Sequence, residues 1–328
     1  KLYMSNEITW RLENENIGRL LVHYAIPAVI GTMVNALYNI VDRIFIGQGV
    51  GALAISGLTL TFPILLFMQA FGMLIGAGAA TRVSIHLGRK ANDLADNVLG
   101  NAFTLTFIIG ALTIIPSMIF LDDLLMWFGG SEQTIPYAKD YLYIAIPGNL
   151  LATLSFSFNA VMRASGYPKK AMFTMMIGAV LNVILDPIFI FGLDLGISGA
   201  ALATALSQCI SFGILFFQSL LRKDCVHLKP GKITLSLSLY GEILHGGIPS
   251  LCRQGIASIA TAALNLAANP FGDAAIAALS IVSRYMMFIG SAMIGFGQGF
   301  QPVCGFNFGA KRYDRVLESF WFCVKVSV

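Results

Sequence analysis

Charged residues are scarce in this sequence, and their scarcity excludes an ordinary water-soluble fold. Asp, Glu, Lys and Arg make up 12% of the 328 residues, against 56% hydrophobic residues, whereas a typical soluble domain carries roughly 25% charged residues. A mean hydropathy of +0.75 points the same way. Most of the surface is therefore expected to face lipid.

Paired cysteines and histidine clusters are lacking as well. The five cysteines show no C-x-x-C spacing, and the four histidines, expected near one membrane face, form no cluster with them, so no metal centre of the usual spacing is predicted. No nucleophile and base stand together near the end of a hydrophobic run, and no strand precedes a glycine-rich stretch. We therefore expect no enzyme, no catalytic residues and no bound cofactor.

Long windows without charge are present instead. Residues 44–81, for example, contain no Asp, Glu, Lys or Arg, and about 20 apolar residues suffice for a helix to cross the bilayer core. Such windows recur too often for buried core helices and are too long for strands of a membrane barrel. We predict an all-α, polytopic membrane protein in which a ninth span begins near residue 316. The complete spans are expected at 20–45, 53–79, 98–121, 138–162, 169–192, 196–221, 243–268 and 274–301.

Basic residues alternate between the predicted loops. Sixteen Lys and Arg fall on the side of the N-terminus, whereas the opposite loops hold five acids and Lys139. The positive-inside rule then places the N-terminus in the cytoplasm of a multi-pass protein of the cell (inner or plasma) membrane. These loops account for the net charge of +4, and no nucleic-acid partner is expected. The first apolar stretch is too long for a cleavable signal peptide.

The chain also resembles itself at an offset of about 222 residues. Ile26-Pro27 returns as Ile248-Pro249, and the segment 88–93 returns as 309–314. Because the repeat unit holds six spans, both copies have the same orientation, which is a parallel repeat. We predict two six-helix lobes, the second incomplete, with about 120 further residues needed for twelve spans. The N-terminal lobe is expected at 1–222, a cytoplasmic inter-lobe loop at 223–242, and the first part of the C-terminal lobe at 243–328.

Two acids lie well inside the hydrophobic windows, where ionisable groups are costly and usually functional. Asp42 lies in the outer part of the first span and Asp186 in the outer half of the fifth. Asn182 is one helical turn from Asp186, and Thr204 lies at a similar depth in the sixth span. These oxygen atoms could bind sodium, and the carboxyl groups could instead take up a proton, so both coupling ions stay open. Tyr38 lies one turn from Asp42.

Prolines interrupt two of the spans. Pro187 directly follows Asp186, and Pro27 lies in the first span with Gly31 one turn later. A proline inside a helix frees a backbone carbonyl, and a broken backbone is tolerated in a membrane where it lines a cavity. We expect Pro27, Gly31 and Pro187 to act as hinges, with a static kink as the alternative.

Several strings of residues resemble the multidrug and toxic compound extrusion (MATE) family, over essentially the whole chain. The resemblance implies two lobes forming a V around a central cavity, and export of organic, often cationic compounds in exchange for protons or sodium. It also implies a coupling site at Asp42, Asn182, Asp186 and Thr204, and bending of the first helix at Pro27. The strings are Leu37-Tyr38-Asn39-Ile40-Val41-Asp42, Arg163-Ala164-Ser165-Gly166-Tyr167-Pro168, Leu181-Asn182-Val183-Ile184-Leu185-Asp186-Pro187 and Gly199-Ala200-Ala201-Leu202-Ala203-Thr204.

One branch of that family places a glutamate in its seventh helix, whereas residues 249–254 here contain no acid, which favours coupling in the N-terminal lobe. A flippase for lipid-linked sugars or lipids is the alternative function, because Arg253 and Arg284 could supply a basic cavity. We expect small organic substrates, membrane lipids as partners, and a monomer. The substrate cavity is expected to be lined by Tyr38, Asn39, Asn159, Arg253 and Arg284.

Overall fold

The computed structural model describes residues 6–128, 132–221, 226–229, 231, 233–268 and 273–327. Within these residues the fold is all-helical, as predicted, with eleven α-helices, one π-helix and no strand. In chain order they are α1 (Asn6–Asn14), α2 (Ile17–Gly49), α3 (Ala52–Gly88), α4 (Asn92–Ile119), α5 (Leu121–Trp127), α6 (Ile135–Ala164), α7 (Pro168–Pro187), η1 (Ile188–Gly192), α8 (Gly196–Leu221), α9 (Leu237–Ala268), α10 (Asp273–Gly309) and α11 (Tyr313–Ser327).

Six of the described helices are long and apolar enough to cross a membrane, and they match the first six predicted spans. They are α2, α3, α4, α6, α8 and the continuous unit of α7 with η1. The seventh and eighth predicted spans coincide with α9 and α10, helices of 32 and 37 residues that are not among those six. The chain is therefore a multi-pass membrane protein.

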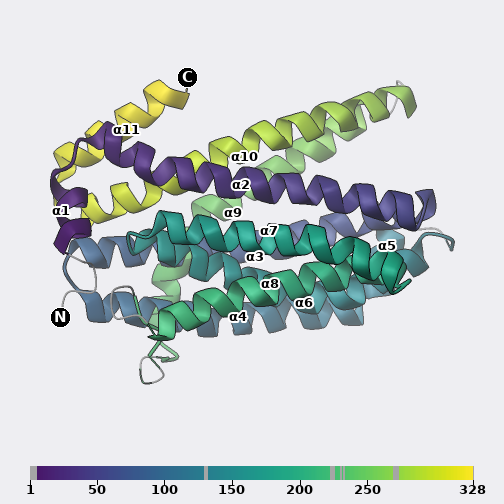
Figure 1. Ribbon diagram of the computed structural model, residues 1–328, viewed down its shortest axis with the longest axis horizontal. Coiled ribbons are helices and arrows are strands. Elements are labelled where there is room, and N and C mark those ends of the chain that lie inside the picture. Colours follow the sequence, from purple (N-terminus) through teal and green to yellow (C-terminus); the bar gives the residue numbers. More distant parts are fainter. Residues whose placement is uncertain are drawn as a thin grey trace.

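The six spans form one bundle whose helices run along the long axis of the molecule (Figure 1). α3 packs on α6, α6 on α8, and α2 on α7. The buried apolar side chains form two clusters, one toward each end of the bundle. The first contains Leu20, Val83, Leu99 and Phe158 among others, and the second contains Ile46, Leu125, Leu142 and Ile197.

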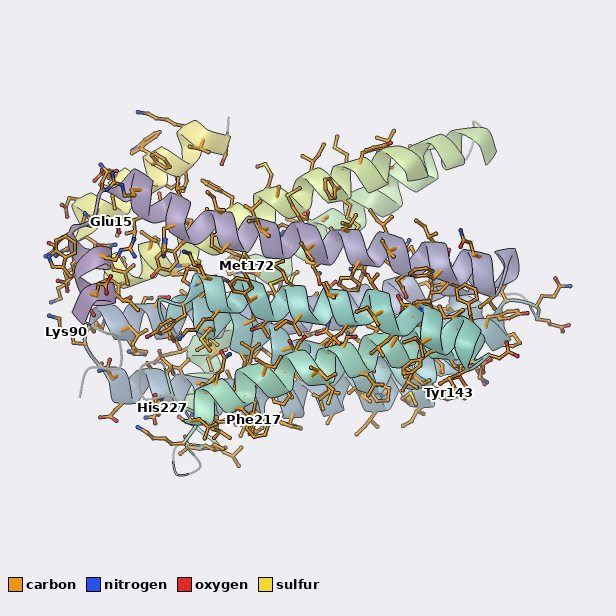
Figure 2. All side chains as sticks on the ribbon, in the orientation of Figure 1. Glu15, Lys90, Tyr143, Met172, Phe217 and His227 are labelled. Carbon is orange, nitrogen blue, oxygen red and sulfur yellow. The ribbon has the colours of Figure 1, made fainter. Side chains whose placement is uncertain are left out.

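Helix α1 and three turns gather at one end of the bundle, which we call the α1 end. The turns are 89–91, 165–167 and 310–312. Figure 2 shows Glu15 and Lys90 at this end and Tyr143 at the opposite end, which we call the α5 end. Three of the predicted basic loops therefore lie together with α1 on one side of the molecule.

The sequence repeat appears in the geometry of two of these turns. Lys90 and Lys311 both adopt the left-handed conformation, with φ of 59° and 60°. The backbone N–H groups of residues 89–91 bond to the carbonyls of Ile85, Leu87 and His86, and those of residues 310–312 bond to the carbonyls at the matching positions 306, 308 and 307. Two segments that are similar in sequence thus fold alike.

Helices α9 and α10 lie against α3 and α2 of the bundle. The contact between α3 and α9 is close because both helices present glycine there. A side-chain carbon at Gly78 would collide with the Ile243 carbonyl, and one at Gly247 would collide with the Leu74 carbonyl. Toward the α5 end, α9 and α10 diverge from α2 (Figure 1), and Arg253 and Tyr285 are exposed there.

Candidate functional site

The polar layer near the α5 end is built from α2, α7 and α8. Asp42 of α2 is 7% exposed, and Asp186 and Asn182 of α7 are 0% and 1% exposed. Thr204 of α8 is half-buried. The four residues, predicted from their depth and implied by the family resemblance, come from three helices, and the structure brings them to one place.

Asn182 holds this layer together. Its Nδ2 donates to Thr204 Oγ1 at 3.1 Å and to Asp186 Oδ1 at 3.4 Å. The carboxyl groups of Asp42 and Asp186 lie within hydrogen-bonding reach of each other. Two carboxylates accept hydrogen bonds only, so a bond between them requires that one of them carries a proton.

Three buried oxygen atoms of this layer have no hydrogen-bond partner among the described residues: Asp42 Oδ1, Asn182 Oδ1 and Asp186 Oδ2. Buried polar groups are nearly always paired, and an unpaired one costs about 1–3 kcal/mol. Three acceptors without a donor suit a bound proton or a hard cation, which takes oxygen ligands. These three oxygen atoms could therefore bind sodium as well as a proton.

The end of α7 places Asp186 at the site. Pro187 has no N–H to donate, so the helical hydrogen-bond ladder changes there. The chain continues as the π-helix η1, and Leu193 N–H bonds to the Ile188 carbonyl five residues back at 2.9 Å. Single turns of π-helix often occur at functional sites. The interruption at Pro187 was predicted from the sequence, but the π-helix was not.

The next layer toward the α1 end contains Tyr38, which is half-buried. Its hydroxyl interacts with the side chains of Asn39 and Gln208. Asn39 also donates to the Asn35 carbonyl at 2.7 Å. Gln208 was missed in the sequence, although it lies one turn after Thr204 on α8 and its amide is polar inside an apolar helix.

Tyr141 of α6 is a second residue that sequence reasoning missed. It is 8% exposed, and Asp42 and Tyr38 are among the groups that act on it electrostatically. It belongs to the apolar cluster at the α5 end, so α6 closes the site from that side. An uncharged aromatic residue in an apolar span gives no signal that separates it from core residues.

The two other predicted hinge residues lie in α2, which continues through Pro27 without a break. Pro27 is buried, and the side chain of Met175 of α7 lies against Gly31, its Sδ 3.0 Å from where a Cβ would stand. One turn beyond Pro27, Thr32 Oγ1 donates to the Ser291 carbonyl of α10 at 2.8 Å.

Two of the predicted cavity residues, Asn159 and Arg253, lie away from this layer. Asn159 is 4% exposed and sits near the α1 end, where its amide donates to the Ala171 carbonyl at 2.8 Å and its oxygen accepts from Arg163. Arg253 is exposed on α9. The side chain of Arg284 lies outside the described residues. The described residues contain no cluster of three His, Cys, Asp or Glu side chains that could hold a metal ion.

Known proteins resemble this chain along most of its length. The MatE family model matches residues 27–188 and 249–328. The multidrug export protein MepA of Staphylococcus haemolyticus (strain JCSC1435) is 31% identical over 314 residues, which cover 94% of this chain and 68% of that protein.

Solved structures share the fold. A multidrug resistance MATE family transporter of the MOP superfamily, in an outward-facing conformation, superposes with a TM-score of 0.91 at 25% identity, covering 98% of this chain and 71% of that one. A MOP superfamily transporter from Pyrococcus furiosus Vc1 (DSM3638), described as having a binding pocket of reverse polarity that suggests a different function, has the same TM-score, identity and coverage.

Proposed function

Because the chain belongs to the MatE family, whose members are membrane transporters and not enzymes, we propose that it exports organic, often cationic compounds in exchange for a proton or a sodium ion. The observation that carries this proposal is the set of three unpaired buried oxygens at Asp42, Asn182 and Asp186. Three acceptors without a donor at one place in the apolar part of the molecule support the binding of a proton or a cation there.

The proposed orientation places the α1 end in the cytoplasm. Basic loops favour the cytoplasmic side, and the α1 end carries the turns that contain Arg89, Lys90, Lys311 and Arg312. In this orientation α9 and α10 separate from α2 on the outer side, which supports a state that is open outward.

Exchange follows if the ion and the substrate weaken each other's binding. Two facing carboxyls with one proton between them present less negative charge than two carboxylates, and a sodium ion neutralises them in the same way. A cationic compound is then held less strongly, so ion uptake from outside releases it, which is negative coupling between two ligands. Alternating access between two lobes, with bending of α2 near Pro27 and Gly31, would carry the ion inward.

Export of lipid-linked sugars or lipids is the second candidate. It is supported by Arg253, a basic residue that is exposed on one face of α9. A basic group on that face suits a phosphate-bearing substrate, since Arg pairs with phosphate in a two-pronged geometry.

Proteoliposomes that contain the full-length protein test the proposal. A fluorescent organic cation is loaded, and a proton or a sodium gradient is imposed separately. Export driven by one gradient, lost in Asp42→Asn and kept in Asp123→Asn, is expected; Asp123 is an exposed acid near the same end of the molecule. Normal gradient-driven export by Asp42→Asn would refute the role of this site, and no export under either gradient would favour the lipid-linked substrate.

A further inference from the structure

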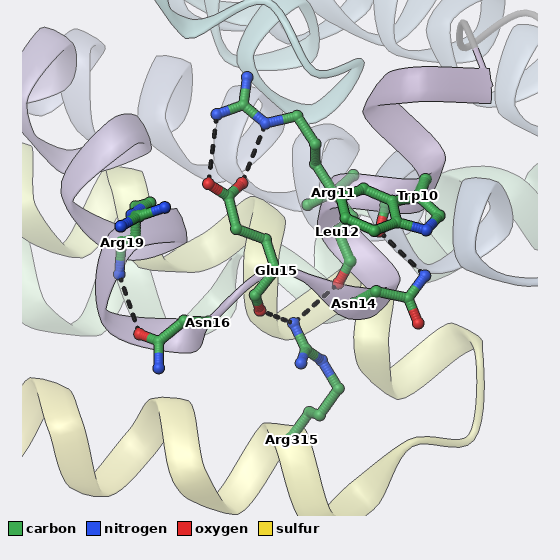
Figure 3. A network of polar contacts seen from close by, with 8 residues as sticks. All are labelled: Trp10, Arg11, Leu12, Asn14, Glu15, Asn16, Arg19 and Arg315. Carbon is green, nitrogen blue, oxygen red and sulfur yellow. Dashed lines mark hydrogen bonds and ion pairs between the residues drawn. The ribbon is translucent and has the colours of Figure 1, made fainter.

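At the α1 end, two arginines of the segment that follows α10 reach back to the first helix. Figure 3 shows one of them, Arg315. Arg315 Nη2 donates to the Leu12 carbonyl at 3.2 Å and to the Glu15 carbonyl at 2.8 Å. Arg312 Nη1 donates to the Glu13 carbonyl at 2.6 Å. The residues that these contacts join are separated in the sequence by almost the whole length of the described chain.

The three carbonyls are natural targets for guanidinium groups. Helix α1 ends at Asn14, and the last carbonyls of a helix lack intrahelical partners and carry partial negative charge. Arginine presents several donors in a planar fork, so one side chain can satisfy two such carbonyls. Asn16 Oδ1 accepts from Gly18 N at 3.0 Å, which fixes the turn into α2 directly beside them.

Arg315 is held in place from its own side. Its Nε donates to Asn307 Oδ1 at 3.1 Å, and the Asn307 amide donates to the Val303 carbonyl at 2.9 Å. Asn307 is 0% exposed. The guanidinium is therefore oriented toward α1 by a buried side chain of α10, and less side-chain entropy is lost when its hydrogen bonds form.

Helix α1 is attached to the six-span bundle as well. Leu12 is 1% exposed and belongs to the apolar cluster at this end, and Glu13 pairs with Lys90 of the turn 89–91 at 3.9 Å. The contacts of Arg312 and Arg315 thus bridge the bundle and the α10–α11 segment.

The repeat shows that the arginines are not needed to form their own turn. The turn 89–91 has the same left-handed lysine and the same three backbone hydrogen bonds as the turn 310–312. At the positions that correspond to Arg312 and Arg315, however, the first copy has Ala91 and Leu94. The guanidinium groups therefore serve the bridge to α1 and not the turn.

We propose that Arg312 and Arg315 form a latch that holds the bundle and the α10–α11 segment together at the α1 end in the state that is open at the α5 end. This rests on the proposed alternating access. For the α1 end to open, the α10–α11 segment must move away from α1, and the three hydrogen bonds to the carbonyls of residues 12, 13 and 15 must break. The latch then sets the ratio of outward-open to inward-open carriers.

Distance measurements between spin labels test the latch in the full-length protein with its native cysteines replaced by serine. Labels at Lys169→Cys and Asp314→Cys, both exposed at the α1 end, report the separation of the bundle from α11. With both arginines present we expect one main distance. In the double variant Arg312→Gln, Arg315→Gln we expect the ratio of a longer distance to the main one to rise about tenfold, the equivalent of one net charge-assisted hydrogen bond.

The matched control is Lys311→Gln, which removes one positive charge from the same turn at an exposed position. It should leave the distances unchanged, and the same shift in this control would overturn the proposal, because it would show an effect of charge alone. An unchanged distribution in the folded double variant would also overturn it. If the double variant does not fold, Arg315→Gln alone keeps the Arg312 bond and should show a smaller shift, whose absence counts against the latch.

These distances are recorded without substrate or gradient. If the protein exports no organic cation but shows the shift, the proposed substrate is refuted and the latch is supported. If it exports the cation and shows no shift, the latch is refuted and the proposed substrate is supported.

Discussion

The side-chain nitrogen of Asn182 lies 3.1 Å from the hydroxyl oxygen of Thr204, so that α7 and α8 are joined beside two buried carboxyl groups. Because the same nitrogen also contacts Asp186 Oδ1, the amide is oriented with its own oxygen left without a partner among the described residues. The orientation of one amide thus decides how many acceptors the site offers to an ion.

Replacing Thr204 by valine tests this arrangement. The variant keeps the shape of the side chain but removes the acceptor of Asn182, and an interhelical hydrogen bond in a membrane contributes about 0.6–2 kcal/mol. We expect export driven by an ion gradient to fall by up to about tenfold, because ~1.4 kcal/mol is a factor of ten in affinity. Thr204→Ser keeps the hydroxyl and serves as the control; equal transport by the valine and serine variants would contradict the role of this bond.

A double-mutant cycle on Tyr38 and Gln208 measures the contact between α2 and α8. Tyr38→Phe and Gln208→Leu each remove one side of the same polar interaction, so their effects on thermal unfolding should not add. The expected coupling is about 0.6–1.7 kcal/mol. Additive effects would mean that the two side chains act independently.

Glycine at position 78 is required by the approach of α9. Gly78→Ala would push a methyl group into the Ile243 carbonyl, and backbone cannot move aside as a side chain can. We expect the melting temperature to fall by several degrees. Gly213→Ala is the matched control, since nothing lies within 4 Å of a side-chain carbon there, and a similar loss in both variants would argue against a special contact at Gly78.

Asp96 fastens the segment 226–229 to α4. It is 0% exposed and accepts from His227 N and from Lys229 Nζ, both at 2.8 Å. Asp96→Asn removes the ion pair and leaves a buried amide in its place, so amide hydrogens of 226–229 should exchange at least tenfold faster. Asp140→Asn, at an exposed position, should leave this exchange unchanged; unaltered exchange in the Asp96 variant would show that other contacts hold the segment.

Much of the fold followed from the sequence, because uncharged windows and helix length report directly on the membrane. The first six spans were confirmed as helices. The uncharged windows predicted the ends of the helices less accurately. Helix α3 continues to Gly88, well beyond the predicted end at residue 79, because a helix does not stop where charged residues begin. Helices α1 and α5 and the π-helix η1 were not predicted, since nothing in their composition sets them apart from loops or from the spans that they adjoin.

The candidate site was predictable only where a residue is costly in its surroundings. Asp42 and Asp186 are conspicuous as acids in apolar spans, and counting residues gave their depth. Depth does not tell which face of a helix a residue occupies, so Tyr141 and Gln208 were missed. Asn159 lies near the other end of the molecule, close to the end of its predicted span at residue 162. That Asn159, Arg253 and Arg284 line a substrate cavity stays a prediction.

The connection between α8 and α9 has a mechanical consequence. Asp96 holds 226–229, and Asn101 holds the connection again just before α9, through Thr234 Oγ1 at 3.0 Å and Ser236 N at 3.1 Å. The chain is thus anchored directly before α9, and we expect a tilt of α9 to pivot near its first turn at Leu237, in a movement that also shifts α9 against α3 at Gly78 and Gly247. A helix of 32 residues is about 48 Å long, so a rotation of roughly 10° about this pivot moves its far end by about 8 Å. The same rotation of roughly 10°, which is small enough to keep the contacts near Ser236, would displace Arg253 by about half of those 8 Å.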